Sequence, residues 1–246
     1  MSAAQLAALI RERQPCVALT GAGVSTESGI PDFRSPTGIW AKFDPLEYAS
    51  LDAFRRDPAK VWSFYAPRFA MLANAEPNAA HRALAELERR GLMRAVVTQN
   101  IDLLHERAGS REVLEVHGSI RTSSCLDCGA SFPLAAIEEQ LKSRDAPVCS
   151  CGAILKPDVV FFGELLPTAT IDRAYALAAE AGVLLVVGST LEVWPVAELP
   201  LVTRRAGGTV AIVNLGPTAR DEDAELRIDG SAGKTLESVV AALDAA

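Results

Sequence analysis

Short apolar segments alternate along the chain with longer segments in which apolar residues recur every three or four positions. Five runs have strand length and end at turn-forming residues: 16–19, 95–98, 113–116, 183–187 and 209–213. A helical pattern over 81–90 follows Asn78 as its capping residue and stops at Gly91. Amphipathic helices are also expected over 1–14 and 234–246. Such alternation predicts an α/β fold, a Rossmann-like, doubly wound parallel sheet with helices on both faces.

Two stretches interrupt this alternation and predict a second, smaller domain formed by two insertions. Residues 36–76 contain most of the aromatic side chains, and 119–156 contain four of the five cysteines. We expect 1–35, 77–118 and 157–246 to form the nucleotide-binding domain. The two insertions would form the small domain, a helical module joined to a zinc-binding module.

Composition narrows the classes of function. The 246 residues include 24 Lys and Arg against 31 Asp and Glu, a net charge of −7, which disfavours an extended nucleic-acid surface. No apolar run reaches the length of a membrane span, and residues 1–14 lack a basic leader. Paired cysteine spacings favour a reducing compartment. We therefore expect a cytoplasmic protein, a monomer in the absence of any interface signal, that binds neither nucleic acid nor membrane.

A Gly-X-Gly turn directly after the first predicted strand predicts a nucleotide site. Gly21 and Gly23 lie where a chain brings backbone N–H groups close to a pyrophosphate. The third glycine of the dehydrogenase pattern would fall at Thr26, and the acidic residue expected about 20 positions later is missing. The turn therefore predicts a nucleotide cradle that differs from that of the dehydrogenases.

Four cysteines have the spacing of a structural zinc site: Cys125, Cys128, Cys149 and Cys151. Two pairs of thiolates make a closed tetrahedral S₄ set, which selects zinc and leaves no open catalytic position. The second pair is C-x-C rather than the commoner C-x-x-C. Cys16, alone in the first strand, is expected to be a core residue.

Polar residues suited to sugar chemistry follow two further strands: Gln99, Asn100, Asp102 and His117. Because the carboxyl ends of parallel strands share one edge, we expect these side chains to gather near the glycine turn. Amides orient hydroxyls, and a neutral imidazole such as that of His117 accepts a proton. Asp102 is also placed to cap a helix over 103–108. His81 and His105 lie within helical patterns and are expected to be structural.

The ordered set of motifs resembles the sirtuins, the NAD-dependent protein-lysine deacylases, over nearly the whole chain. The matching segments are 21–25 (GAGVS), 29–34 (GIPDFR), 99–102 (QNID), 117–118 (HG), the four cysteines, 156–164 (KPDVVFFGE), 188–191 (GSTL), 214–215 (NL) and 230–232 (GSA). No single motif is decisive, but their order along one chain is highly specific.

The resemblance implies NAD as cofactor and a set of NAD-binding residues. They are Gly21, Ala22, Gly23, Ser25, Thr26, Asp32, Phe33, Arg34, Gln99, Asn100, Ile101, Asp102, Gly188, Ser189, Thr190, Asn214, Leu215 and Ala232. The backbone of Ala22 and Gly23 would hold the pyrophosphate. Gln99 and Asn100 would hold the nicotinamide ribose, and the two residues after them the carboxamide. Phe33 would cover the site after nicotinamide leaves.

The resemblance also implies the reaction, with His117 and Asn100 as catalytic residues. The acyl-lysine carbonyl oxygen would attack the ribose as nicotinamide departs, and His117 would then act as general base on a ribose hydroxyl. For an acetyl group the products are nicotinamide, free lysine and O-acetyl-ADP-ribose. Few titratable groups are needed, because positioning contributes most of the rate enhancement.

Substrate would bind as an extended peptide carrying an acylated lysine. The candidate backbone edges are Phe162, Gly163 and Glu164 on one side and Val193 on the other. Val160 and Phe162 would form the walls of an apolar tunnel for the lysine stem.

Two alternatives to deacetylation remain open. Tyr65 and Arg68 have the Tyr-x-x-Arg spacing of the desuccinylating and demalonylating branch, where an arginine and a phenol bind the terminal carboxylate of the acyl chain. Thr26 and Asp32 replace the alanine and threonine usual in that branch and favour deacetylation. Protein mono-ADP-ribosyl transfer shares the cofactor and the first bond broken, whereas a non-enzymatic NAD sensor would have no need of His117.

Overall fold

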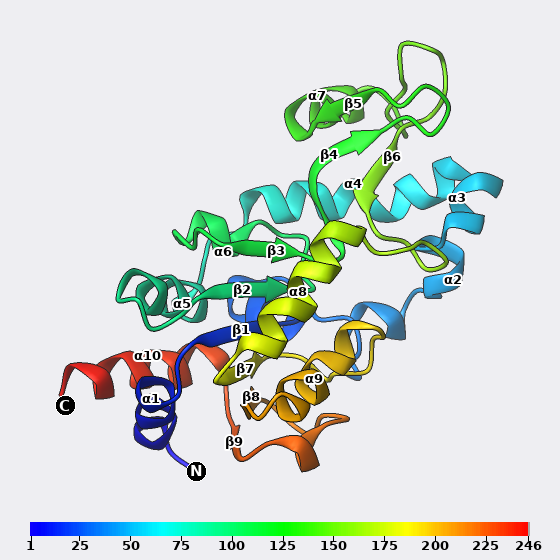
Figure 1. Ribbon diagram of the computed structural model, residues 1–246. Coiled ribbons are helices and arrows are strands. Elements are labelled where there is room, and N and C mark those ends of the chain that lie inside the picture. The colour runs from blue at the N-terminus through cyan, green and yellow to red at the C-terminus, as the bar shows by residue number, and fades with distance from the viewer. Residues whose placement is uncertain (246) are drawn as a thin grey trace.

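A six-stranded parallel sheet forms the centre of the computed structural model, which describes residues 1–245 (Figure 1). The strand order is β3-β2-β1-β7-β8-β9. The bounds are β1 Cys16–Thr20, β2 Ala95–Thr98, β3 Val113–Glu115, β7 Val183–Val187, β8 Thr209–Asn214 and β9 Leu226–Asp229. Because β1 pairs in parallel with β2 and β7, the carboxyl ends of these three strands lie at one edge, and the strand order reverses between β1 and β7. The predicted doubly wound sheet is confirmed.

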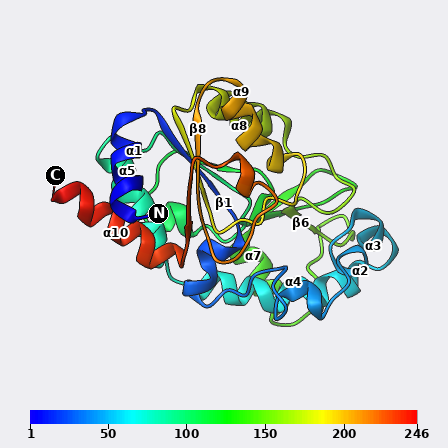
Figure 2. The same ribbon diagram turned by 90° about the horizontal axis from the view of Figure 1, so that it is seen from below.

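Helices cover both faces of this sheet. On one face lie α1 (Ala3–Glu12), α5 (Ala79–Arg89) and α10 (Ala232–Asp244), and on the other α8 (Thr168–Glu180) and α9 (Leu199–Arg205) (Figures 1 and 2). Successive residues of a strand point alternately into the hydrophobic cores on the two faces of the sheet. Cys16 and Ala18 pack with α1, α5 and α10, whereas Val17 and Leu19 pack with α8 and α9. This is why the strands are apolar along their whole length.

A second body of structure lies beyond the carboxyl edge of the sheet (Figure 1). It contains a three-stranded sheet of order β5-β4-β6, with β4 Gly118–Ser124, β5 Ser131–Pro133 and β6 Lys156–Val159. Its helices are α2 (Pro45–Tyr48), α3 (Leu51–Arg56), α4 (Pro58–Asn74) and α7 (Leu134–Leu141). The remaining short elements are α6 (Leu104–Arg107), η1 (Ala22–Ser28), η2 (Ile39–Ala41), η3 (Val196–Glu198) and η4 (Asp221–Asp223).

One hydrophobic core joins the two insertions. Trp62 on α4 is fully buried and donates its indole N–H to the backbone oxygen of Leu155 over 2.7 Å. Ile120, Ile137 and Phe161 pack in the same core. The division into two domains stays a prediction, and β6 runs across the expected boundary at 156/157 to pair with β4.

The capping residues predicted for one helix, Asn78 and Gly91, lie at its two ends in the structure. Asn78 caps α5, its side chain accepting the backbone N–H of Ala80 over 2.9 Å, and Gly91 ends the helix region with φ of 72°. The helix expected over 103–108 is the shorter α6, and the one expected from 234 begins at Ala232. Among residues 1–245, no helix combines the length and apolar character needed to cross a membrane.

Candidate active site

A cleft of about 1330 Å³ lies between the carboxyl edge of the large sheet and the second body of structure. It is lined by the glycine turn, by the ends of β2 and β7, by α4 and by the segment after β6. All residues predicted to bind NAD or substrate, together with His117, line this one cleft. The structure thus brings together segments that lie up to two hundred residues apart.

The glycine turn fits closely against the end of β7. Gly21 and Gly23 donate their backbone N–H groups to the oxygens of Val187 and Gly188, over 3.1 and 2.8 Å. A Cβ added to Gly23 would lie 2.8 Å from the Cα of Gly188, so only glycine permits this approach. Because the Gly23 N–H is bonded to Gly188, it is not free to donate to a ligand, which differs from the role expected for the Gly23 backbone.

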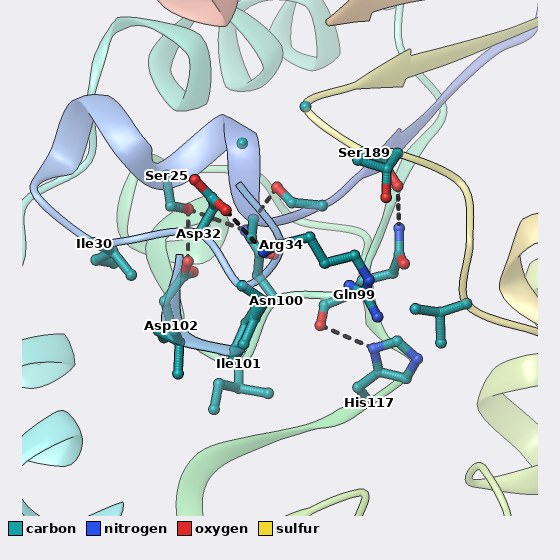
Figure 3. A pocket seen from close by; sticks show the side chains of 18 of the residues that line it. Ser25, Ile30, Asp32, Arg34, Gln99, Asn100, Ile101, Asp102, His117 and Ser189 are labelled. Carbon is teal, nitrogen blue, oxygen red and sulfur yellow. Dashed lines mark hydrogen bonds between the residues drawn. The ribbon is translucent and has the colours of Figure 1, made fainter. Parts of the chain in front are cut away.

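Three side chains form a buried polar cluster beside the turn: Ser25, Asn100 and Asp102 (Figure 3). Asn100 Nδ2 donates to Ser25 Oγ over 3.0 Å, and the Ser25 hydroxyl donates to Asp102 Oδ2 over 2.7 Å. The other Asp102 oxygen accepts the backbone N–H of Leu104 over 3.0 Å. Asp102 therefore lines the cleft and binds the first backbone N–H of α6, although the N-cap position is Leu103 rather than Asp102 as expected.

His117 is oriented by a backbone contact. Its Nδ1 lies 3.1 Å from the backbone oxygen of Gln99, and because a carbonyl only accepts, Nδ1 must carry the proton. The lone pair of a neutral ring is then on Nε2. Burial lowers the pKa of His117, and the positive charge of Arg34 acts in the same direction, while the bond to Gln99 opposes them. The ring is suited to accept a proton at neutral pH.

Gln99 links two strand ends across the cleft. Its Nε2 donates to Ser189 Oγ over 2.9 Å (Figure 3). Ser189 follows β7, so the contact ties the end of β2 to the loop after β7. At the far end of the cleft, Asn214 donates to the backbone oxygens of Leu215 and Gly216, over 3.0 and 3.1 Å, and Ala232 begins α10.

The loop after η1 is held by Asp32. Its Oδ1 accepts the backbone N–H groups of Arg34 and Ser35 over 2.9 and 2.7 Å. The Arg34 guanidinium forms an ion pair with Glu192 over 3.2 Å, bridging this loop and the loop after β7. Both side chains are partly exposed, so the pair contributes little to stability.

An apolar end of the cleft lies against α4. Val160 and Phe162 line it, together with Tyr65 and Arg68 from α4. The Tyr65 ring stacks on Phe161 with centroids 5.3 Å apart. This placement brings the Tyr-x-x-Arg pair to the same space as the predicted tunnel walls.

Arg68 has an unusual environment within this apolar end. Its guanidinium lies over the rings of Phe64 and Phe43, 3.5 and 4.8 Å from their centroids, and donates to the backbone oxygen of Phe64. It forms no ion pair with any carboxylate of the described residues, and burial lowers its pKa. A half-buried cation without a counter-charge is suited to an anionic group entering the cleft.

The predicted peptide edge is partly engaged within the protein. Phe162 donates its backbone N–H to Ala49 and accepts from Leu51, over 2.8 and 3.0 Å. The Glu164 carboxylate pairs with Lys156 over 2.9 Å and accepts the Phe161 N–H over 2.8 Å. Gly163, with φ of 87°, lies between them.

The four predicted zinc ligands come together on two turns, near residues 125–130 and 149–153. All four Sγ atoms lie within 4.8 Å of one another, and two pairs, Cys125 with Cys151 and Cys128 with Cys149, are 3.5 Å apart. Four thiolates at about 2.3 Å from a tetrahedral zinc lie about 3.8 Å apart, so the set fits zinc. No further histidine or carboxylate of the described residues joins the cluster.

Sequence reasoning missed two kinds of residue. Trp40, Phe64 and Trp194 line the cleft, and only the gathering of aromatics over 36–76 hinted at the first two. His81 and His105 lie buried beneath it, their ring centroids 4.8 Å apart. Their helical setting gave no sign that His81 contacts Ser25 of the polar cluster or that His105 contacts Thr20.

Comparison with known proteins gives a consistent result. Residues 21–195 match the model of the Sir2 family. An NAD-dependent protein deacetylase of Caldivirga maquilingensis is 47% identical, over 95% of this chain and 91% of that protein. An NAD-dependent protein deacylase of Archaeoglobus fulgidus is 45% identical, over 94% of both.

Solved structures agree with these relatives. A Sir2 variant in complex with deacetylated p53 peptide and 3'-O-acetyl ADP ribose matches with a TM-score of 0.94 and 40% identity, covering 98% of both chains. A Sir2 protein bound to acetylated peptide matches with a TM-score of 0.90 and 38% identity, again over 98% of both.

Proposed function

The chain belongs to the Sir2 family, and we propose that it is an NAD-dependent protein-lysine deacetylase that forms nicotinamide, free lysine and O-acetyl-ADP-ribose. The observation that carries the proposal is the single cleft that holds the glycine turn, the Ser25–Asn100–Asp102 cluster and His117 together.

The residues present fit NAD. The glycine turn lines the cleft with residues that have little or no side chain, as a pyrophosphate site requires, and the polar cluster presents an amide and a carboxylate of the kind that bind a ribose and a carboxamide. When bound, NAD supplies the ribose carbon to which the acyl oxygen is transferred as nicotinamide leaves.

The protein's own contribution is orientation and one proton acceptor. Asn100 and Gln99 orient ribose hydroxyls from the end of β2, and the buried Asp102 fixes the carboxamide end. His117, held in one tautomer by Gln99, accepts the hydroxyl proton at Nε2. The four cysteines, which do not line the cleft, would hold a zinc that supports the structure.

The substrate we propose is an acylated lysine within an extended peptide. Val160, Phe162 and Tyr65 present an apolar entrance for the lysine stem. Leu165 and Trp194, which are 92% and 59% exposed, flank this entrance and provide apolar surface for neighbouring peptide residues. With Phe162 engaged by the protein, the free edge for peptide pairing is Gly163 and the loop at Val193.

Arg68 supports a second activity, removal of succinyl or malonyl groups. A guanidinium that pairs with no carboxylate of residues 1–245 and lies on aromatic rings in the apolar end of the cleft is suited to bind an acyl-chain carboxylate. We rank this below deacetylation on account of Thr26 and Asp32.

Product analysis tests the proposal directly. Incubation with NAD and an acetyl-lysine peptide is expected to yield nicotinamide, lysine peptide and O-acetyl-ADP-ribose in equal amounts, as measured by mass spectrometry. Free acetate instead of O-acetyl-ADP-ribose would indicate simple hydrolysis and contradict the proposal. Transfer of labelled ADP-ribose onto protein, independent of any acyl-lysine, would favour the transferase alternative.

We also propose a cytoplasmic monomer that binds no nucleic acid, on the support of composition and cysteine usage alone. Light scattering of the purified protein tests the monomer.

A further inference from the structure

A buried histidine that has no part in the proposed chemistry lies directly beneath the cleft. His105, on α6, is 2% exposed and packs against His81 on α5. Neither ring lines the cleft. His81 contacts the polar cluster through Ser25, 3.4 Å from Nε2 to Oγ, whereas His105 reaches a different group of atoms.

A chain of hydrogen bonds leads from His105 to the backbone of Asn100. His105 Nε2 lies 2.9 Å from Thr20 Oγ1, and the Thr20 hydroxyl donates to Thr98 Oγ1 over 2.8 Å. The same Thr98 oxygen accepts the backbone N–H of Asn100 over 3.0 Å. Because Thr20 uses its only proton on Thr98, the proton between His105 and Thr20 must come from Nε2. His105 is thus the donor that begins the chain.

The Thr20 and Thr98 hydroxyls lie at the ends of the two strands that lead into the glycine turn and Asn100. Thr20 and Thr98 are paired residues at the last positions of β1 and β2. The next residue after Thr20 is Gly21, whose oxygen accepts from Asn100 Nδ2 over 3.2 Å. The hydroxyl pair therefore controls how the glycine turn and Asn100 lie relative to one another.

The stability of the core does not account for a histidine at this position. Its Nδ1 is buried without a hydrogen-bond partner among residues 1–245. A buried polar atom without a hydrogen-bond partner lowers the stability of the folded protein by about 1–3 kcal/mol. Burial keeps the ring neutral by lowering its pKa, so no ion pair offsets that cost. A leucine would fill the same space without leaving a buried polar atom unpaired.

We propose that His105 is a positioning residue for the NAD-dependent reaction, acting through the Thr20–Thr98 hydroxyl pair to hold Asn100 where the nicotinamide ribose binds. The inference rests on the proposed deacetylase function. His105 itself touches neither NAD nor the acylated peptide.

Three variants and one control separate this role from general stabilisation. His105→Leu removes the donor, whereas His105→Gln retains a side-chain N–H. Thr20→Val removes the hydroxyl link at nearly constant shape. The control is Thr203→Val on α9, which loses a buried hydrogen bond of 2.7 Å to the Ala178 oxygen, outside the cleft. Thermal unfolding of each variant reports the stability change.

The readouts are the dissociation constant for NAD, by calorimetry, and kcat/KM for NAD. Loss of one positioning hydrogen bond is worth about tenfold, so His105→Leu and Thr20→Val are each expected to weaken NAD binding by about that factor. His105→Gln is expected to stay within about threefold and Thr203→Val within about twofold of the wild type, with KM for the peptide unchanged. Because His105 and Thr20 act through one chain of hydrogen bonds, the double variant His105→Leu/Thr20→Val is expected to bind NAD no more weakly than either single variant.

Two results would overturn the inference: NAD affinity in His105→Leu equal to that of Thr203→Val, or defects that multiply in the double variant. If His105→Leu does not fold, unchanged NAD affinity in Thr20→Val overturns it equally. Failure of the proposed function is distinguishable, because the wild type itself would then lack NAD-dependent deacetylation.

Discussion

At the scale of single residues, the site depends on keeping His117 neutral. Burial and the nearby charge of Arg34 lower its pKa, and the Gln99 oxygen fixes the proton on Nδ1. As pH falls through this lowered pKa, the ring takes up a proton and Nε2 can no longer act as a base. The acid limb of kcat/KM is therefore expected below the ordinary histidine pKa of about 6.5.

A pH–rate profile with an acetyl-lysine peptide measures that limb. His117→Ala is expected to reduce deacetylation by about 10²–10⁴-fold and to abolish the limb. An acid limb that persists in His117→Ala would show that another group is responsible.

Arg68 carries the prediction about acyl selectivity. Arg68→Met keeps the volume of the side chain but removes the charge that has no carboxylate partner. Removal of a succinyl group is expected to fall by at least about tenfold, whereas deacetylation changes little. Kinetics with two peptides that differ only in the acyl group measure this, and equal loss of both activities would exclude a role in acyl selection.

The buried histidines also make stability depend on pH. Burial lowers the pKa of His105 in the folded protein, so below pH 6.5 the unfolded chain binds a proton that the folded chain does not. Folding stability is then lost as pH falls, by up to about 1.4 kcal/mol per pH unit for each such histidine.

The matched comparison is wild type against His105→Leu. The free energy of unfolding of the wild type, relative to the variant, is expected to decrease between pH 7 and 5, as measured by urea unfolding. A difference that stays constant over this range would contradict the burial of a neutral His105.

At the scale of elements, sequence patterns predicted the parts of the fold that are buried on both sides. The runs over 95–98 and 183–187 coincide with β2 and β7, because strands covered by helices must be apolar throughout. β9 was missed, since Arg227 and Asp229 interrupt its apolar pattern at the edge of the sheet. The small antiparallel sheet was missed too, because β4 is rich in serine and threonine.

Asn78 connects α5 with η1, and its substitution tests how much this connection contributes to stability. It caps α5 and also donates to the Val24 oxygen and to Ser28 Oγ on η1, over 2.8 and 3.0 Å. Asn78→Ala is expected to lower the free energy of unfolding by about 1–2 kcal/mol, or Tm by about 2–8 °C. Asn74→Ala, at the exposed end of α4, serves as the control. A smaller loss for Asn78→Ala than for the control would contradict the capping role.

At the scale of the whole molecule, the cleft forms where the large sheet meets the second body of structure. The motifs of the large sheet were predictable because strand ends in a parallel sheet share one edge. The opposite wall was not, since Tyr65 on α4 meets Phe161, which follows β6, only through tertiary packing. His105 went unrecognised for the same reason, because its partner Thr20 lies on β1, far from α6 in the sequence.

Zinc is expected to hold that opposite wall in place. Cys125 and Cys149 lie within the core shared by the two insertions, so loss of the metal loosens the core that carries Tyr65 and Phe161. One zinc per chain is expected by elemental analysis, and Cys128→Ser is expected to lose zinc and deacetylation together. Cys16→Ala, in the core of the large sheet, is expected to retain zinc. Full activity without zinc would contradict a structural role for the metal.

NAD-dependent deacetylation is tested most directly by nicotinamide release from NAD with an acetyl-lysine peptide, with the unmodified peptide and with no peptide. Release that requires the acetylated peptide, and that falls in His117→Ala, is the expected result. Equal release under all three conditions would contradict deacetylation, identify the cleft as that of a glycohydrolase or ADP-ribosyltransferase, and remove the role assigned to His117.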